Sequence, residues 1–200
     1  MKTLKSVFLG FTLLFTVIIS RGQNIELTSG DFEKLRAEKT INLEFNWDKF
    51  GVGDYAKEAQ WIKYKVNDLN SKEAGSGDKW LQEWNDAKLG RYAPKFMELF
   101  TKYSDITFDS TAKYTLIFKT SFLEPGFQVA VKAKPGQVEG QIWLVETTNK
   151  TKKIAVVMVE RREGKGAHFD WATRIAEAYG STGKNLALLI KKDLNKKKDN

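Results

Sequence analysis

Apolar and polar residues alternate strictly over residues 40–47, where Ile41, Leu43 and Phe45 fall on one side and polar residues on the other. A period of two is typical of a half-buried β-strand, so this segment predicts the first strand of a core sheet. Phe32 precedes it in residues 29–38, which predict a short helical segment.

Three longer segments repeat their apolar residues at steps of three and four, as helices with one buried face require. The first runs over residues 54–69 and opens at Asp54, and the last begins at Asp170, a residue type that caps helices well. The middle helix begins at Asp78 and continues to about residue 103. Gly90 and Pro94 should interrupt it, because proline cannot donate the helical hydrogen bond.

Residues 114–123, 137–146 and 154–159 are rich in aromatic and β-branched side chains and predict three further strands. The link between the last two is short and polar, so they should form a hairpin. A long helical connection separates strand 40–47 from strand 114–123. If these two strands are adjacent, they should therefore pair in parallel through a right-handed crossover.

This order of elements predicts an α/β fold: a two-layer sandwich in which helices pack on a small mixed sheet of about four strands. The length suits one domain, which we expect to span residues 23–192. Residues 193–200 are basic and predict a disordered tail.

The first 22 residues predict a cleaved signal peptide. Lys2 and Lys5 precede an apolar run over residues 7–19, and small residues follow at positions suited to cleavage, so the mature chain should begin at Gln23 or Asn24. The run is shorter than the ~20 residues of a spanning helix, so we expect no transmembrane segment. These features predict a periplasmic or secreted protein.

Composition narrows the chemistry further. The chain has no cysteine, which excludes disulfides, thiolate chemistry and a lipoprotein's lipid-bearing cysteine. Its formal charge of +8 falls to +5 once Lys2, Lys5 and Arg21 leave, and residues 191–200 hold +3 of that remainder. The folded body is therefore nearly neutral, so we expect no nucleic-acid partner.

Two glycine motifs resemble nucleotide-binding loops only in part. Residues 51–56 match G-x-G-x-x-A, but no second strand follows the helix soon enough, so we interpret them as a turn. Residues 180–184 have two residues between their glycines instead of four and lie within the last predicted helix. We interpret these glycines as allowing close helix-to-sheet packing, and we predict no cofactor.

No constellation predicts catalysis. His168 is the only histidine and is interpreted as a loop or helix-capping residue, so neither a metal site nor a histidine base is expected. The carboxylates of Glu124, Glu139, Glu146 and Glu160 lie on or beside predicted strands, where exposed charges are usual. We therefore predict no catalytic residue and no metal, and we expect that the protein is not an enzyme.

Three features suggest binding, modification or a turn. Trp61 and Trp80 fall off the apolar stripes and are candidates for exposed aromatic binding contacts. Ser110, in Asp-Ser-Thr, is a candidate for O-glycosylation, although the same residues also suit a local Asx or ST turn. Pro125 and Gly126 suit the second and third positions of a type II turn.

Several segments resemble a family of uncharacterised secreted bacterial proteins. These segments are the Lys-Tyr-Thr-Leu strand at residues 113–116, the Glu-Pro-Gly turn at 124–126 and the Arg-Ile-x-Glu-Ala-Tyr helix at 174–179, with Gly-Asp-Lys-Trp at 77–80 as a helix start. The strand-then-helix half is distantly similar to envelope lipoprotein domains and to the amino-terminal domain of TolB. This resemblance implies a protein that engages other proteins and is not an enzyme.

The function predicted from these observations is that of an exported, soluble, non-catalytic binding module that contacts proteins of the bacterial envelope. The alternative is a carbohydrate-binding or glycan-processing protein of the same compartment. A pocket lined by Trp61 or Trp80 and two carboxylates would favour the sugar alternative. A shallow apolar patch or an unpaired sheet edge would favour protein contact.

Overall fold

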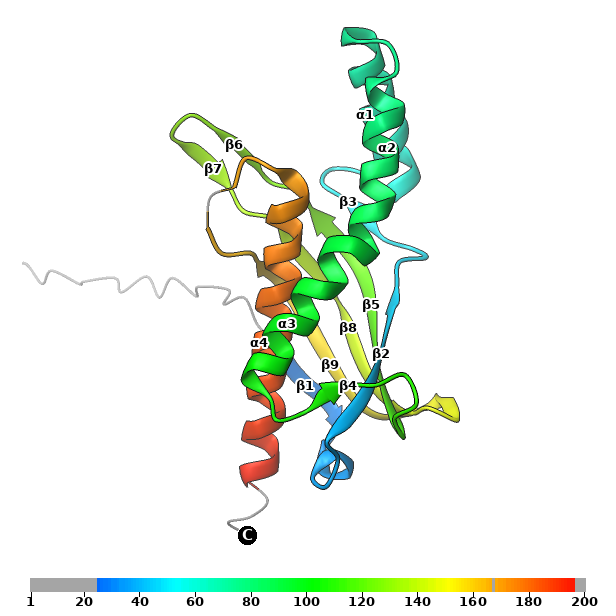
Figure 1. Ribbon diagram of the computed structural model, residues 1–200, viewed down its shortest axis with the longest axis vertical. Coiled ribbons are helices and arrows are strands. Elements are labelled where there is room, and N and C mark those ends of the chain that lie inside the picture. The colour runs from blue at the N-terminus through cyan, green and yellow to red at the C-terminus, as the bar shows by residue number, and fades with distance from the viewer. Residues whose placement is uncertain (1–24, 167, 197–200) are drawn as a thin grey trace, which may run out of the picture.

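Seven strands form one mixed sheet in the computed structural model, which describes residues 25–166 and 168–196 (Figure 1). The predicted signal peptide lies outside these residues. The strands are β1 (Ile25–Gly30), β2 (Thr40–Asn46), β3 (Gly51–Val52), β4 (Thr107–Phe108), β5 (Tyr114–Glu124), β8 (Gln137–Glu146) and β9 (Asn149–Glu163). Strands β6 (Phe127–Val129) and β7 (Lys132–Lys134) form a separate hairpin.

The strand order is β1-β9-β8-β5-β2-β4, with β3 also paired to β5. Strand β2 runs parallel to β5, and β8 and β9 form an antiparallel hairpin, so both predicted pairings are confirmed. Strand β1 adds to the far side of β9 in the antiparallel sense.

The prediction of about four strands was too low, although the mixed α/β class is confirmed. Strands β3 and β4 have two residues each, which is too short for any alternation to show. Strand β1 alternates only at Ile25 and Leu27, and its last two residues fall in the segment that the sequence predicts to be helical. That segment contains a single 3₁₀ turn, η1 (Glu33–Leu35).

The helices are α1 (Glu58–Lys72), α2 (Ser76–Ala87), α3 (Ala93–Tyr103) and α4 (Trp171–Lys196). The expected interruption near Gly90 and Pro94 is a π-helical turn, η2 (Lys88–Tyr92), between α2 and α3. Helix α1 begins four residues after Asp54, because Tyr55 forms a bridge with Val52 before the helix starts. None of the described helices is long and apolar enough to cross a membrane.

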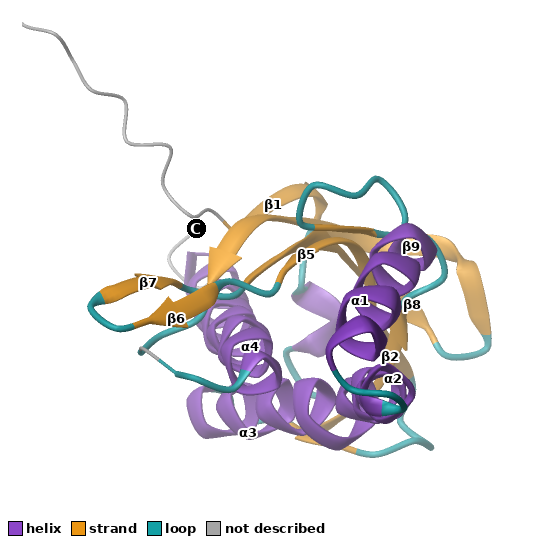
Figure 2. Cartoon of the chain, turned by 90° about the horizontal axis from the view of Figure 1, so that it is seen from above, coloured by secondary structure: helices purple, strands orange, loops and turns teal. Residues whose placement is uncertain are grey.

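Helices α3 and α4 lie against one face of the sheet, which curves around them (Figure 2). Phe118 on β5 points into this layer, where its ring contacts Phe96 of α3 and Tyr179 of α4. Helices α1 and α2 pair with each other and extend beyond the end of the sheet (Figure 1). Consistent with that position, α1 has no fully buried residue.

Glycines bring α3 and α4 into close contact. A Cβ atom built on Gly183 would lie 2.4 Å from the carbonyl oxygen of Phe96, and one on Gly180 would lie 2.9 Å from a side-chain atom of Leu99. The packing predicted for these glycines was helix to sheet, and that detail was wrong, because the backbone they approach belongs to α3.

We expect Gly183→Ala to lower the free energy of unfolding by roughly 1–3 kcal/mol, because the added methyl group must push α3 away from α4. The matched control is Gly90→Ala, where an added Cβ meets no atom within 4 Å. The control should be neutral or slightly stabilising, since alanine favours a helix. Urea denaturation measures the free energy of unfolding of both variants, and an equal change in the two would contradict the close packing of α3 and α4.

The carboxyl-terminal helix extends further than predicted, because α4 continues to Lys196 and the expected disordered tail already began at residue 193. Residues 193 and 194 are held by contacts with the start of the domain. The Asp193 carboxylate accepts a hydrogen bond from the backbone N–H of Phe32 (3.0 Å), and Arg36 donates to the carbonyl oxygen of Leu194 (3.1 Å). Residues 197–200 lie outside the described residues.

Replacing Asp193 with alanine should lower the free energy of unfolding by about 1 kcal/mol, because the Phe32 N–H would lose its acceptor. Lys192→Ala, an exposed neighbour, should leave the stability unchanged. Thermal denaturation of both variants distinguishes a docked helix end from a free tail, in which neither substitution would have an effect.

Candidate functional site

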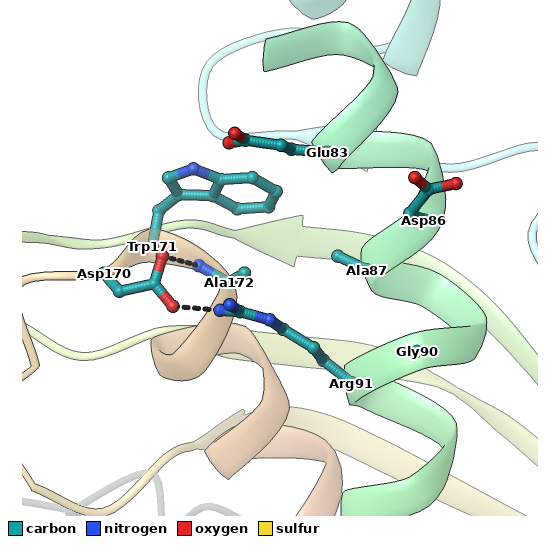
Figure 3. Close-up of a pocket in the computed structure, with 8 residues that line it drawn as sticks. All are labelled: Glu83, Asp86, Ala87, Gly90, Arg91, Asp170, Trp171 and Ala172. Atoms are coloured by element: carbon teal, nitrogen blue, oxygen red, sulfur yellow. Dashed lines mark hydrogen bonds and ion pairs between the residues drawn. The ribbon is translucent and has the colours of Figure 1, made fainter. Parts of the chain in front are cut away.

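One cleft lies where α2 and η2 meet the start of α4, and it has a volume of about 390 Å³ (Figure 3). Its lining residues are Glu83, Asp86, Ala87, Gly90, Arg91, Asp170, Trp171 and Ala172. The cleft therefore brings one indole together with three carboxylates and one guanidinium.

Asp170 serves both as a helix cap and as an ion-pair partner. Its carboxylate accepts hydrogen bonds from the backbone N–H (3.0 Å) and the hydroxyl (2.6 Å) of Thr173, as predicted for a capping residue, and it pairs with Arg91. Partial burial would raise the pKa of Asp170, but the Thr173 hydrogen bonds and the Arg91 charge outweigh it and hold this pKa below its usual value. Both charges are therefore engaged in joining α4 to η2.

The other two carboxylates of the cleft, on Glu83 and Asp86, have no hydrogen bond or ion pair with any residue that the structure describes. The Glu83 carboxylate lies beside the Trp171 indole, whereas that of Asp86 points away from it (Figure 3). Across residues 25–166 and 168–196, no group of three or more possible ligands could hold a metal ion. The cleft thus lies at the contact between α4 and η2, and the carboxylates of Glu83 and Asp86 make its lining acidic.

Behind the cleft, aromatic rings pack in series. Trp171 contacts Trp84 (5.1 Å between ring centroids) and Trp80 (6.0 Å), and Trp80 contacts Trp61 (6.4 Å). The expectation that Trp80 is exposed was wrong: its side chain is only 7% exposed, because it is packed between these rings. Trp61 is half-buried. The sequence did not single out Trp171, the indole that lines the cleft.

A second candidate site is the open edge of β2. Strand β4 pairs only with Thr40 and Ile41 among the described residues of β2, and the last hydrogen bond on this side runs from the Asp109 N–H to the carbonyl oxygen of Ile41 (3.1 Å). Because backbone groups alternate along a strand, the N–H and C=O groups of Leu43 and Phe45 point to the same side. No described strand covers that side at these two residues. This is an unpaired sheet edge.

An apolar groove of about 440 Å³ lies beside this edge. Its apolar lining includes Leu43, Phe45 and Trp47 from β2 and the residue after it, and Leu89 and Met97 from η2 and α3. Leu89 is 72% exposed, so the groove presents an apolar side chain to solvent. Free backbone groups next to apolar side chains suit an extended peptide chain.

Ser110 also lines this groove and is exposed. The neighbouring Asp109 carboxylate accepts hydrogen bonds from the N–H (2.8 Å) and hydroxyl (2.7 Å) of Thr111, which is an Asx turn. These bonds lower the pKa of Asp109 below its usual value. Glycosylation of Ser110 stays a prediction.

Pro125 and Gly126 connect β5 to the β6–β7 hairpin, and Gly126 has a φ of 63°, the sign that a type II turn requires at this position. The buried Arg174 of α4 donates hydrogen bonds to the carbonyl oxygens of Pro125 (2.8 Å) and Gly126 (3.2 Å). It also donates to the carbonyls of His168 (2.6 Å) and Phe169 (2.7 Å). The Glu-Pro-Gly and Arg-Ile-x-Glu-Ala-Tyr segments are therefore in direct contact.

The remaining candidates for chemistry are scattered. Glu124 pairs with Lys134 and Glu139 with Arg161, each as an ion pair on the surface. His168 is half-buried, and its Nε2 lies 3.2 Å from the carbonyl oxygen of Lys165. Nothing brings these groups to one place.

Comparisons with known proteins add little. No protein-family model matches the chain, and no curated protein matches it. Among solved structures, the PelC dodecamer from Paraburkholderia phytofirmans is similar at a TM-score of 0.36 and 9% identity, over 82% of this chain and 96% of that chain. A variant of that dodecamer gives a TM-score of 0.25 and 10% identity, over 79% and 96% of the two chains. Likenesses this weak assign no function.

We expect Asp170→Ala to lower the free energy of unfolding at pH 7 by about 1 kcal/mol, through loss of the cap. The native pKa of Asp170 is depressed, so its charge stabilises the fold above the unfolded pKa of roughly 4, and that contribution is lost as the pH falls through the lower native value. The deficit of the variant should therefore shrink below about pH 4. Asp86→Asn, which removes an unpaired carboxylate, should show no such narrowing in acid denaturation.

Proposed function

We propose that this protein is a non-catalytic binding module that contacts other proteins, and that the open edge of β2 receives them. The observation that carries the proposal is the combination of free backbone groups on Leu43 and Phe45 with the apolar groove beside them. An unpaired edge and an apolar patch are the two features that distinguish protein contact from sugar binding in the sequence-based predictions.

The geometry suits one kind of occupant, an extended segment of a partner protein. Such a segment would extend the sheet by hydrogen bonding to β2, and every second side chain would face α3. Those side chains would meet Leu89 and Met97, so apolar residues at alternate positions are expected in the partner. The main-chain bonds would supply affinity and the groove would supply specificity.

The compartment in which this contact takes place is proposed from the sequence alone. A signal peptide over residues 1–22 would bring the mature chain into the periplasm or the medium. The partners would then be envelope proteins.

The alternative of sugar binding at Trp61 and Trp80 has less support. Trp80 is buried among other rings and Trp61 is half-buried, so neither offers a free aromatic face. The cleft of Figure 3 does place an indole near carboxylates, but the indole is that of Trp171, and two of the cleft's charges are paired with each other.

The proposal can be tested by placing the photo-crosslinking residue benzoyl-phenylalanine at Leu89 in the full chain, expressed in a bacterial host that makes the protein naturally. Illumination should yield a discrete covalent adduct with another protein. The matched control is the same residue at Leu188, which is 43% exposed on α4 and away from β2.

Met97→Asp should abolish the adduct formed from the crosslinker at Leu89, since a carboxylate would be desolvated in the groove. Circular dichroism checks that this variant folds. Adducts of equal yield at Leu89 and Leu188, or none at Leu89, would contradict a docking role for the edge of β2.

A further inference from the structure

The face of the sheet opposite α3 and α4 is covered by no described helix (Figure 2). Residues that alternate with the buried ones point to it, among them Lys119 on β5, Trp143 on β8 and Met158 on β9. A hollow of about 540 Å³ lies on this face. It is larger than the cleft between α2 and α4, and it is on the other side of the sheet from that cleft's helices.

Two lysines flank the indole in this region. The ammonium of Lys119 lies 4.2 Å from the ring centroid of Trp143, and that of Lys153 lies 3.7 Å from it. The first lysine is on β5 and the second on β9, so they reach the ring from the two neighbouring strands of β8. Cation–π contact holds both ammoniums near defined positions.

These positive charges are not neutralised by ion pairs. Of the ion pairs between described residues, none includes Lys49, Lys119 or Lys153, although Lys119 is half-buried. Lys49 also lines the hollow, and the acidic residue there, Asp48, accepts a hydrogen bond from Asn46 (2.5 Å). Positioned cations without carboxylate partners favour an anionic ligand.

Neutral groups of the hollow add hydrogen-bonding capacity. The Trp143 Nε1–H group donates to Gln141 Oε1 (2.9 Å), which leaves the amide N–H groups of Gln141 without a partner among the described residues. Ser121 is exposed at a β-bulge, where the pairing of β5 and β8 shifts register. Bulges often occur beside functional sites.

From this combination we infer that the hollow binds an acidic carbohydrate, with a sugar carboxylate on Lys119 and Lys49. The Gln141 amide and the Ser121 hydroxyl would meet sugar hydroxyls, and Met158 and the indole edge would contact the apolar side of the sugar ring. This site is separate from the open edge of β2 and does not depend on the proposed protein contact.

The test is calorimetric titration of the purified chain with hexagalacturonate in low salt. Saturable binding is expected, and it should weaken as salt is added because the charges are near the surface. The fully methyl-esterified hexasaccharide, which has the same sugars without charge, should bind at least tenfold more weakly. Inorganic phosphate should not displace the acidic hexasaccharide at equal concentration.

The variant Lys49→Gln/Lys119→Gln should weaken binding by tenfold or more, whereas Lys119→Arg, which keeps the charge, should retain it. Lys184→Gln is the matched control, because Lys184 makes the same kind of contact with Tyr103 (4.4 Å) on the helical layer. If the double variant fails to fold by circular dichroism, Lys49→Gln and Lys119→Gln are titrated singly and should each weaken binding.

Three results would overturn the inference. They are no saturable binding at low salt, an equal loss of affinity in Lys184→Gln, or displacement of the hexasaccharide by phosphate at equal concentration. The last would show a general anion site with no preference for a sugar.

Discussion

The buried hydroxyl of Tyr179 is the point at which the two layers of this fold are tied together. It accepts a hydrogen bond from the Trp47 indole N–H (2.8 Å) and shares one with the Thr120 hydroxyl (2.6 Å), so a single α4 side chain reaches both β5 and the residue that follows β2. Its ring also stacks on Tyr92 of η2 (5.4 Å between centroids). Burial raises the pKa of Tyr179 above its ordinary value, so the hydroxyl stays neutral and can make both contacts.

That arrangement places α3 and α4 on one side of the sheet, and no helix or strand that the structure describes covers either of the two surfaces discussed above. One is the edge of β2 past Ile41, and the other is the face that carries Trp143. The first offers unpaired backbone groups beside apolar side chains, and the second offers unpaired ammoniums beside amides. The two surfaces therefore suit ligands of different chemistry, a polypeptide in one case and an anion in the other.

Patterns that repeat over many residues predicted the fold well, and short ones did not. The alternation in β2 and β8, the aromatic and β-branched content of β5 and the stripe of α4 predicted these elements with nearly correct bounds, apart from the last turn of α4. Strands β3 and β4 have two residues each, so no alternation of apolar and polar residues marks them in the sequence. The glycines of α4 predict a close approach by another segment, but the sequence does not show that the approaching backbone belongs to α3, as it does at Gly183.

The candidate sites were harder to predict for a related reason. Trp80 departs from the helical stripe of α2, yet it is buried by rings from α1 and α4, which only the tertiary fold brings together. Leu89 also lies off that stripe, so its spacing does not mark it as a binding residue. Its exposure becomes informative because the fold places it beside the unpaired edge of β2. Lys119 and Lys153 lie on β5 and β9, and Trp143 lies on β8 between them, so no local spacing in the sequence marks this cluster.

The contact between Asp193 and Phe32 has a consequence for how the chain acquires its fold. Strand β1 at one end pairs with β9, and η1 just after it is held by the last turns of α4, so the first and last parts of the domain depend on each other. A ribosome releases these partners more than a hundred residues apart, and loop closure over such separations slows folding. Completion of the core must therefore follow synthesis of the final helix, so the nascent polypeptide stays incompletely folded until α4 has left the ribosome.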